Sequence, residues 1–565
     1  MSTTPISGTT PTPAPAAEMV TVTIDGQTQQ FPKGTVLLEA CNQMGAGVPF
    51  FCYHPGLSSP AVCRQCLVDV KGQPKPVPSC YTPVADKMEV MTKSPRALDV
   101  RRQMLEFTLV NHPIDCPICD KAGECMLQKH YFDWDAKLAR NDGIKVKKAK
   151  VVDVGPRIVL DQERCILCTR CIRVCDEVAK NHQLEMADRG DHEILTTAPG
   201  HQLDNPYSLN TVDVCPVGAL TSKDFRFAMR AWELYTTPSI CPGCATGCNL
   251  EVHHSRGKIQ RLIPRQNDQV NKHWMCDEGR LTYKRVHPTV GNLEGVPEPS
   301  RDGLRAAEPH YAHAPRLAAP MSGGSPVEWD KALDDAGRVL RAALDAGSSS
   351  VGVVMSAQST NEDLYALARL TFDHLGLAEA YLSGLDQGWS DDILVSADKN
   401  PNTAGAMAIG AGRLRTLLDL ANDLKSGAVT TLLVVGTHGV LGKDGAGALP
   451  LDRLQTLVVI GTHRDAVAAA AKVALPLTEW AESDGTFTNR LGMVQRVRAA
   501  VPAAGDSLPG WEILSHLARK LGATMEFTEA KAVFAEAKQK LAFMKDADWG
   551  RPLLPVQLRF AGSRG

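Results

Sequence analysis

The placement of the cysteines constrains the fold of this chain more than any other feature. The 565-residue sequence contains 17 cysteines, and all of them lie between Cys41 and Cys276. In a large chain without a secretory signal, clustered thiols are metal ligands or catalytic groups more often than a disulfide framework. We therefore expect a metal-rich N-terminal half and a cysteine-free C-terminal half.

Length and charge exclude several classes of protein. The length corresponds to about four domains, because one hydrophobic core does not grow this large. The 61 basic and 63 acidic side chains are well mixed and give a net charge of -2, so nucleic acid is not expected as a partner. No apolar run approaches the roughly 18 residues of a membrane-spanning helix, and the N-terminus lacks the basic and apolar regions of a signal peptide. These features predict a soluble cytoplasmic protein.

Local patterns predict several elements before the first metal ligands. Residues 1–18 are rich in Pro, Thr and Ala, a composition that predicts a disordered tail. Alternating apolar residues over 20–24, followed by the turn pair Asp25-Gly26, predict a β-hairpin whose second strand ends near Phe31. A short helix is expected within residues 35–45.

A longer helix is expected before the second group of cysteines. Ser94 suits the N-cap position and Pro95 the first helical position, and the apolar spacing extends this helix to about Val110. Pro113 disfavours helical geometry at His112. The imidazole of His112 is therefore expected where the helix gives way to a loop.

Fifteen cysteines and one histidine form four sets with the spacing of metal ligands. Set 1 is Cys52, Cys63, Cys66 and Cys80; set 2 is His112, Cys116, Cys119 and Cys125; set 3 is Cys165, Cys168, Cys171 and Cys215; set 4 is Cys241, Cys244, Cys248 and Cys276. Four thiolates, or three thiolates and an imidazole, also suit structural zinc, which is the alternative for each set.

Sets 1 and 2 each favour an iron-sulfur cluster over zinc. Set 1 has a first Cys, a C-x2-C pair and a later Cys, as in plant-type binuclear sites, although its first gap is ten residues instead of four. Cys41, on the preceding helix, is interpreted as a small buried residue. In set 2, three thiolates and the imidazole of His112 would hold a tetranuclear cluster with one negative charge fewer than four thiolates give.

Set 3 carries the strongest local signal in the chain. The run C-x2-C-x2-C is too tight for the paired knuckles of a zinc ribbon and matches the bacterial ferredoxin pattern for a tetranuclear cluster. Cys215 precedes Pro216, as that pattern requires of the remote fourth ligand. Cys175 has no matching partners near Cys215, so we interpret it as a free thiol at a vestigial half-site.

Set 4 also favours a tetranuclear cluster. Gly243 and Gly247 lie between its first three cysteines and allow a close backbone approach. The amides of such a tight loop can donate hydrogen bonds to cluster sulfurs.

The order of the four sets resembles the large iron-sulfur subunits of bacterial respiratory complex I, with specific motifs over residues 20–285. The C-terminal half, through segments 359–370 and 481–497, resembles the molybdopterin oxidoreductase superfamily more loosely. From about residue 325 onward, helical segments alternate with β-branched runs, which is the α/β signature. The implied fold is a multidomain α+β and α/β protein.

The resemblance implies a domain order. In sequence it gives a disordered tail (1–18), a β-grasp 2Fe-2S ferredoxin-type domain (19–96), a 4Fe-4S domain with one His and three Cys ligands (97–136), a 4Fe-4S ferredoxin-like domain (137–236), a 4Fe-4S module of the molybdopterin oxidoreductase type (237–295) and a degenerate, doubly wound α/β domain (296–565).

The resemblance also implies a function, namely electron relay in proton-translocating NADH:quinone oxidoreductase. Electrons would come from a flavin subunit to set 1, pass to set 3 and then set 2, and leave for another iron-sulfur subunit toward quinone; set 4 would lie off this path. The implied cofactors are one 2Fe-2S and three 4Fe-4S clusters, with no acid, base or nucleophile required of the chain. The implied location is the cytoplasmic side of the bacterial inner membrane, as a peripheral subunit.

Molybdopterin is not expected as a cofactor. In catalytic relatives the segment around Gly485, Thr486, Asn489 and Gln495 helps form the pterin site. Here the C-terminal half has no cysteine to bind molybdenum, and the residue two after Cys276, often basic in that superfamily, is Glu278. A Ser or Asp molybdenum ligand stays open at this point.

Three other functions compete with electron relay in complex I. The first is the catalytic subunit of an NAD-linked molybdenum formate dehydrogenase, which the cysteine-free C-terminal half opposes. The second is an iron-only hydrogenase, which needs further cysteines after Cys276. The third is a zinc-stapled scaffold protein, which would be colourless where an iron-sulfur protein is brown.

Overall fold

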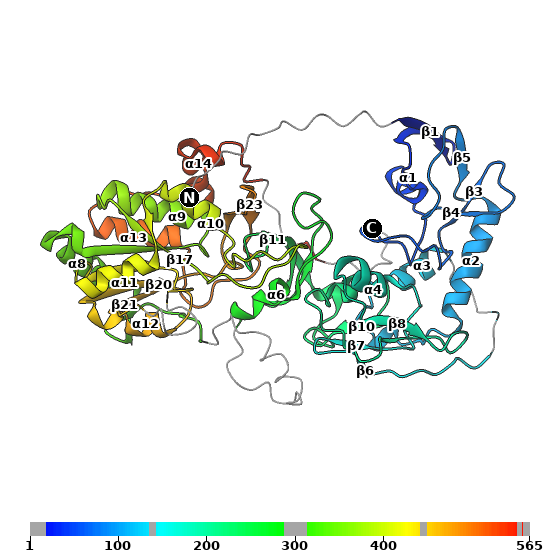
Figure 1. Cartoon of the computed structure of the whole chain (residues 1–565), viewed down its shortest axis with the longest axis horizontal. Helices are drawn as coiled ribbons and strands as arrows, with labels where there is room; N and C mark the ends of the chain where they lie inside the picture. Colours follow the sequence, from blue (N-terminus) through cyan, green and yellow to red (C-terminus); the bar gives the residue numbers. More distant parts are fainter. Residues whose placement is uncertain are drawn as a thin grey trace, which may run out of the picture.

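The protein forms two lobes joined by a smaller middle region (Figure 1). The structure, a computed structural model, describes residues 18–134, 140, 143–287, 314–440 and 449–550, and the backbone of 556–557. Most of the expected disordered tail at 1–18 lies outside the described residues. The N-terminal half of the chain builds one lobe and the C-terminal half builds the other.

The N-terminal domain is a five-stranded mixed sheet with one helix packed on it. Its elements are β1 (Met19–Ile24), β2 (Gln27–Pro32), α1 (Leu37–Gln43), β3 (Leu67–Val70), β4 (Val77–Pro78) and β5 (Met88–Met91), in the sheet order β2-β1-β5-β3-β4. The predicted hairpin is confirmed, and both turn residues have positive φ, 48° at Asp25 and 83° at Gly26. Cys41 lies on α1 and is fully buried in this core, as expected.

The helix predicted from Ser94 is confirmed in detail. α2 (Pro95–Val110) begins with Ser94 as N-cap, whose hydroxyl accepts a hydrogen bond of 3.0 Å from the Ala97 amide. It ends before Pro113, and His112 follows in the loop. The three cysteines of set 2 then lie on and after a single 3-10 turn, η1 (Cys116–Ile118), which leads into α3 (Met126–Trp134).

The next region consists of short elements around one core. They are β6 (Val152–Asp153), β7 (Ile158–Leu160), α4 (Arg170–Arg173), the π-helical turn η2 (Val174–Val178), β8 (Leu184–Ala187), β9 (Ile194–Thr197), α5 (Asn210–Val214) and β10 (Leu220–Ser222). β10, β7 and β6 form one antiparallel sheet, and β8 pairs with β9.

The middle region is a four-stranded antiparallel sheet that the end of the chain joins. Its strands are β11 (Tyr235–Ile240), β12 (Asn249–Ser255), β13 (Lys258–Pro264) and β24 (Val556–Gln557), in the order β13-β12-β11-β24. α6 (Asp277–Arg280), the 3-10 turns η3 (Ala231–Glu233) and η4 (Thr282–Arg285), and the hairpin of β22 (Gly485–Thr488) and β23 (Val494–Val497) lie next to this sheet.

The C-terminal lobe is built on an eight-stranded sheet, six of whose strands are parallel. The strands are β14 (Met321–Ser322), β15 (Ser325–Pro326), β16 (Val351–Ser356), β17 (Ala380–Ser383), β18 (Leu414–Arg415), β19 (Thr431–Val435), β20 (Thr456–Gly461) and β21 (Val473–Pro476). The parallel part runs β21-β20-β19-β16-β17-β18, which is the doubly wound order with its switch point between β16 and β19. The predicted doubly wound fold is confirmed.

Helices cover both faces of this parallel sheet. They are α8 (Trp329–Ala346), α9 (Asn361–Ala368), α10 (Thr403–Gly410), α11 (Leu417–Ser426), α12 (Ala466–Ala470), α13 (Gly510–Lys520) and α14 (Ala530–Lys540), with the π-helical turn η6 (Arg369–His374) and the 3-10 turns η5 (Ser348–Ser350), η7 (Leu451–Arg453) and η8 (Ala542–Met544). Alternate strand residues enter different cores: Leu433 packs with α8, α9 and α13, whereas Leu432 packs with α11. The continuous apolar runs noted in the sequence therefore reflect strands that are buried on both faces.

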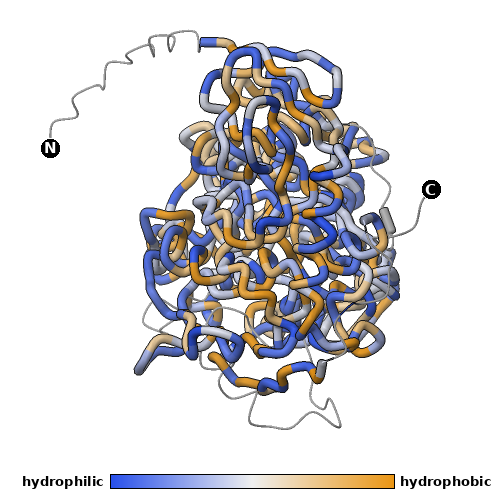
Figure 2. The backbone as a smooth tube through the Cα atoms, turned by 90° about the vertical axis from the view of Figure 1, so that its right-hand side faces the viewer, coloured by the Kyte–Doolittle hydropathy of each residue, from blue (hydrophilic) through white to orange (hydrophobic). Residues whose placement is uncertain are grey.

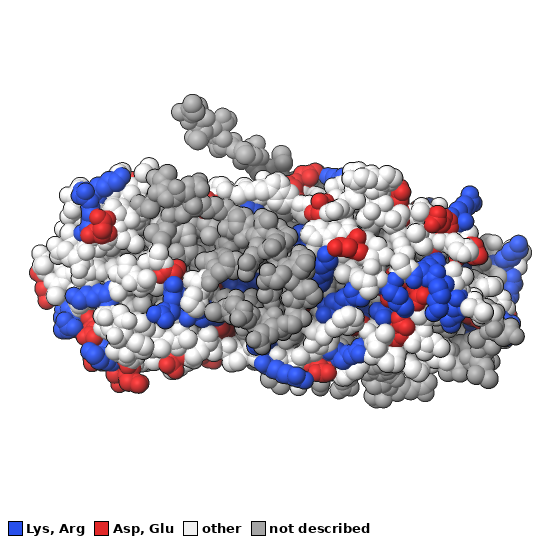
Figure 3. Space-filling view, turned by 90° about the horizontal axis from the view of Figure 1, so that it is seen from below, with Lys and Arg blue, Asp and Glu red and all other residues white. Residues whose placement is uncertain are grey.

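The described helices include no membrane span, and the face drawn in Figure 3 carries charges of both signs. Hydrophobic and hydrophilic stretches alternate along the tube (Figure 2), and none of the helices described is both long and apolar enough to cross a bilayer. Basic and acidic side chains are interspersed on the face drawn in Figure 3. This mixture agrees with the small net charge of the whole sequence.

Candidate iron-sulfur sites

Set 1 gathers its four thiols at one place in the N-terminal domain. The Cys52 thiol hydrogen-bonds with the thiols of Cys63 and Cys80, and the Cys66 thiol also hydrogen-bonds with that of Cys80. The loop between Cys52 and Cys66 is tight, since Ala61 has a φ of 52° and the residue after Cys63 also lies in the left-handed region. Such backbone conformations in non-glycine residues are costly and are typical of ligand sites.

Set 2 lies between the end of α2 and the start of α3. The Cys119 thiol lies close enough to the thiols of Cys116 and Cys125 to interact electrostatically with both. Cys116 is exposed, and Cys119 and Cys125 are buried. Burial lowers the pKa of His112 to about 4, so its imidazole is neutral and unprotonated at neutral pH. Its buried Nδ1 has no hydrogen-bond partner among the described residues. A neutral imidazole with a free nitrogen is the form that binds a metal.

Set 2 is closed on one side by Gly218, which belongs to the segment that carries Cys215. A Cβ atom at Gly218 would lie 2.2 Å from Cys119 Sγ and 3.2 Å from Lys121 Cβ. Glycine is therefore the only residue that fits here without moving the Cys119 thiol.

Set 3 lines a small pocket formed by the loop before α4 and by the end of α5. All four thiols border this pocket, together with Leu167 and Thr169. Leu167 and Thr169 have φ of 54° and 60°, and the Leu167 amide donates to Cys165 Sγ at 3.4 Å. Burial raises the pKa of Cys165 to about 12 and that of Cys168 to about 11, so positive metal charge is required to ionise these thiols.

Cys175 lies outside this pocket although it is close in sequence. It is fully buried in the turn after α4, and its sulfur accepts a weak hydrogen bond from Asn205 Nδ2 at 4.0 Å. Burial raises its pKa to about 12, which keeps the thiol protonated. Its interpretation as a free thiol stays a prediction.

Set 4 lines a pocket in the middle region, with α6 on one side. The amides of Gly243 and Gly279 donate to Cys241 Sγ and Cys276 Sγ at 3.4 and 3.3 Å. A Cβ at Gly279, on α6, would lie 2.9 Å from Cys241 Sγ, and one at Gly243 would lie 3.4 Å from the same sulfur. At Gly247, the other glycine of the predicted loop, a Cβ would lie 2.7 Å from Gln495 Oε1. Amide donors to sulfur stabilise the reduced, more negative state of a cluster.

A lysine from a distant segment completes the surroundings of set 4. Lys399 lines the same pocket, has a side chain that is only 4% exposed, and pairs with Glu278 at 3.1 Å. The resemblance to the molybdopterin oxidoreductase superfamily implied a basic residue at the position of the acidic Glu278. In this fold Lys399, which is distant in sequence, supplies a basic group beside set 4.

A Lys399→Met variant is expected to lower the reduction potential of a cluster in set 4. Loss of a buried positive charge beside the site disfavours the added electron by about 1–2 kcal/mol, or roughly 50–100 mV, at an effective dielectric constant near 20. Redox titration followed by electron paramagnetic resonance measures the shift. The exposed Lys331→Met variant is the control; equal potentials in all three proteins would contradict this role of Lys399.

Two buried arginines connect set 1 directly to set 3. Arg173 Nη2 donates to the carbonyl of Cys52 at 2.6 Å and to the carbonyl of Cys168 at 3.3 Å. Arg170, one turn earlier on α4, donates to the carbonyl of Tyr53. The two thiol sets are thus held side by side by guanidinium groups that satisfy loop carbonyls.

The region around set 2 also contacts the regions around sets 1 and 3. The Met126 amide donates to the carbonyl of Pro216 at 3.0 Å, and His130 Nε2 is 3.2 Å from the carbonyl of Phe50. One hydrophobic core contains residues from all three regions: Phe51, Leu105, Cys125, Leu127, Cys171, Cys215 and Leu220. Set 4 belongs to a different core, which includes Cys241, Cys248, Cys276, Trp480 and Phe487.

Five protein-family models match the chain in the order of these sites. They are a 2Fe-2S iron-sulfur cluster binding domain (17–95), the NADH-ubiquinone oxidoreductase-G iron-sulfur binding region (101–136), the NADH-quinone oxidoreductase subunit 3 ferredoxin-like domain (155–221), the molybdopterin oxidoreductase Fe4S4 domain (234–288) and molybdopterin oxidoreductase (377–520).

Several similar proteins are named as the G subunit or as an iron-sulfur protein of NADH dehydrogenases, and they align with between 63% and 95% of this chain. The G subunit of NADH-quinone oxidoreductase from Rickettsia prowazekii is 29% identical over 88% of this chain and 87% of its own length. The protein of that name from Streptomyces coelicolor is 36% identical over 63% of this chain. NADH dehydrogenase (ubiquinone) iron-sulfur protein 1 of Solanum tuberosum is 29% identical over 95% of this chain and 85% of its own length. The chain is similar to the G-subunit family of NADH-quinone oxidoreductase.

The match to some members of this family is partial. The aligned part spans 40–42% of the length of the Streptomyces and Mycobacterium proteins. The C-terminal region of the chain is of the molybdopterin oxidoreductase type, as the sequence indicated.

The segment that resembles a pterin site is hydrogen-bonded to other parts of the chain. The amide and hydroxyl of Thr486 bind Glu362 at 2.7 and 2.8 Å, and Asn489 Nδ2 donates to the carbonyl of Thr246 at 3.3 Å. A Cβ at Gly485 would lie 2.6 Å from the side chain of Thr360. These polar groups therefore brace segment 481–497 against its neighbours.

Sequence reasoning did not single out several residues that shape the sites. Arg170 lies between Cys168 and Cys171, and Arg173 lies two residues after Cys171, so basic residues beside these cysteines were the available signal. Gly218 and Lys399 gave no local signal, because each acts on a set that is distant in sequence.

Proposed function

We propose that this chain is an electron-transfer subunit of a proton-translocating NADH:quinone oxidoreductase. Set 1 would hold one 2Fe-2S cluster, and sets 2, 3 and 4 would each hold a 4Fe-4S cluster. The observation that carries the proposal is that residues of sets 1, 2 and 3, which are far apart in sequence, pack around one core with direct contacts between them. The clusters would supply one-electron transfer without a proton-transferring side chain of this protein.

The residues of the chain position and tune these sites. The thiols hold iron, the amides of Leu167, Gly243 and Gly279 donate to ligand sulfurs, and burial keeps water away. The contacts through Arg173 support an adjacent placement of sets 1 and 3. Set 4, whose thiols belong to a second core, would lie off the main path.

The proposal includes partners and a location. The names of the relatives support assembly with a flavin subunit that binds NADH and with other iron-sulfur subunits of the peripheral arm. Contact with the membrane would be indirect, through the assembled complex on the cytoplasmic side of the bacterial inner membrane. We also propose that no molybdopterin is bound, which the internal bonds of Thr486 and Asn489 support.

Metal content of the purified chain tests the proposal. Protein prepared without oxygen should contain about 14 irons, no stoichiometric molybdenum, and both binuclear and tetranuclear signals in low-temperature electron paramagnetic resonance. Zinc in place of iron, or stoichiometric molybdenum, would reject it.

A pair of cysteine variants tests the ligand assignment in set 3. Cys215→Ser is expected to lose the signal and about four irons of this cluster, because it removes one of four ligands. Cys175→Ala is the matched control, since Cys175 is equally buried and four residues from Cys171. If Cys175→Ala lost about four irons and Cys215→Ser lost none, Cys175 and not Cys215 would be the fourth ligand.

A further inference from the structure

The C-terminal lobe has a polar pocket that electron relay does not use. It lies beside the switch point of the parallel sheet, where the loops after β16 and β19 separate. Its lining includes Gln358, Ser359, His438 and Glu479. Doubly wound sheets bind ligands in this position, outside the carboxyl ends of the strands.

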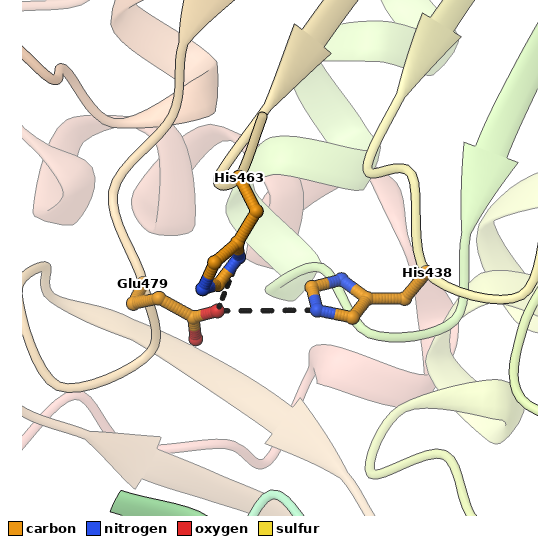
Figure 4. Close-up of side chains that lie close together, drawn as sticks. All are labelled: His438, His463 and Glu479. Atoms are coloured by element: carbon orange, nitrogen blue, oxygen red, sulfur yellow. Dashed lines mark ion pairs between the residues drawn. The ribbon is translucent and has the colours of Figure 1, made fainter. Parts of the chain in front are cut away.

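Three side chains from consecutive parallel strands converge here: His438 and Glu479 line the pocket, and His463 lies next to them. His438 follows β19, His463 follows β20 and Glu479 follows β21. In Figure 4 one oxygen of Glu479 faces both imidazole rings. Glu479 Oε1 is 3.9 Å from His438 Nε2 and 3.8 Å from His463 Nδ1, and the three ligand atoms lie within 4.8 Å of one another.

The oxygen that faces the two rings lacks a hydrogen-bond partner. Glu479 has a side chain that is 2% exposed, and its Oε1 is buried without a partner among the described residues. Its other oxygen, Oε2, accepts from Arg285 Nε at 3.2 Å and from the Trp480 amide at 3.3 Å. The carboxylate is therefore fixed on one side and unsatisfied on the side of the imidazoles, which is costly unless a cation or donor occupies that position.

The surroundings orient both imidazoles as metal ligands. His463 Nε2 lies 2.9 Å from the carbonyl of Arg285, to which it can only donate, so the lone pair of Nδ1 points toward Glu479. A ring N–H bound to a backbone carbonyl is the usual support of a metal-binding histidine. The hydroxyl of Thr462, 2.8 Å from Nδ1, has to turn away when a metal binds.

The loop that carries His438 is fixed by glycines. Gly436 and Gly439 have φ of 81° and 76°, and a Cβ at these positions would lie 2.6 Å from the side chain of Ser356 and 1.8 Å from the carbonyl of Gly384. Burial, with Arg285 nearby, lowers the pKa of His438 to about 4. Its ring is therefore neutral at pH 7 and able to bind a metal.

We propose that His438, His463 and Glu479 bind a divalent metal ion of the zinc class, with the fourth coordination position open to the pocket. Two imidazole nitrogens and one carboxylate oxygen are a ligand set that zinc uses when one position stays open. Tetrahedral zinc needs neighbouring ligand atoms roughly 3.4 Å apart, so Glu479 Oε1 has to approach each nitrogen by about half an ångström.

Charge on Glu479 favours this site over a simple hydrogen bond to a protonated imidazole. Burial alone would raise the pKa of Glu479, but the neighbouring Arg285 outweighs it and lowers the pKa, so the carboxylate is ionised beside neutral imidazoles. Arg285 is the main positive charge that would repel a metal ion. It donates hydrogen bonds to Glu479 Oε2 and to Gln358, which leaves Glu479 Oε1 available to the metal.

Zinc binding to the full chain, loaded with iron and sulfide, tests this proposal. We expect one zinc ion per chain at micromolar free zinc, and a zinc K-edge absorption spectrum with only nitrogen and oxygen neighbours. His438→Ala and Glu479→Gln should each weaken this binding at least about 100-fold, because loss of a supporting residue alone costs 10–100-fold. Iron content and thermal unfolding show whether each variant folds.

The control is His516→Ala, which removes a partly exposed histidine on α13 of the same lobe. It should bind zinc like the parent chain. No zinc, zinc with sulfur neighbours, or zinc that persists unchanged in both His438→Ala and Glu479→Gln would each overturn the proposal. These outcomes are independent of the iron signals that test electron relay.

Discussion

A Gly218→Ala variant is expected to purify with about four fewer irons than the parent chain and without the signal of the set 2 cluster. The added methyl group would lie 2.2 Å from Cys119 Sγ, so the thiol has to rotate out of the position that it shares with Cys116 and Cys125. A rotated thiol no longer points to the cluster, and three remaining ligands hold it poorly. Iron analysis and low-temperature electron paramagnetic resonance measure the loss.

The neighbouring Val217→Ala variant separates this effect from general destabilisation. Val217 is 1% exposed and packs in the same core, so its truncation leaves a small cavity without approaching Cys119. It should keep all the irons and unfold at a somewhat lower temperature. Full iron content in Gly218→Ala, with an unchanged spectrum, would show that Cys119 does not bind the cluster as proposed.

The second large effect is expected at His112. A His112→Cys variant should retain a tetranuclear cluster whose reduction potential is lower by at least roughly 100 mV. The thiolate adds one negative charge where the parent has a neutral imidazole, and replacing thiolates by imidazoles raises the potential of Rieske centres. The low pKa of His112, about 4, means that the parent imidazole is neutral over the working pH range.

His130→Gln is the matched control for this variant. His130 is also buried near set 2, and burial lowers its pKa to about 4, but its Nε2 contacts the carbonyl of Phe50. Its replacement should leave the potential of the set 2 cluster within a few tens of millivolts of the parent value, since no ligand changes. A shift in His130→Gln but not in His112→Cys would reverse the assignment of the ligand.

Local sequence signals were sufficient for most of the fold. Asp25 and Gly26 predicted the first hairpin because only a few residue types adopt positive φ in a two-residue turn. Ser94 predicted the start of α2 through its cap on Ala97. In the C-terminal half, apolar β-branched runs between helical segments predicted the parallel sheet, since each strand is buried on both faces.

The surroundings of the candidate sites could not be read from the sequence. Lys399 reaches Glu278 across 121 residues, and Arg173 reaches Cys52 across the same separation. The group formed by His438, His463 and Glu479 exists only because three consecutive strands end at one edge of the sheet. Contacts of this kind depend on strand order and domain packing, which residue spacing does not encode.

The arginines of α4 have one more consequence for this protein. Because Arg170 and Arg173 bond directly to carbonyls in the loop around Cys52 and Tyr53, these contacts and not the intervening chain fix the separation of the first and third thiol sets. Insertions or deletions in surface connections between residues 96 and 157 can therefore accumulate without altering that separation. A change in the length of these connections would therefore leave the first and third thiol sets at the same distance from each other.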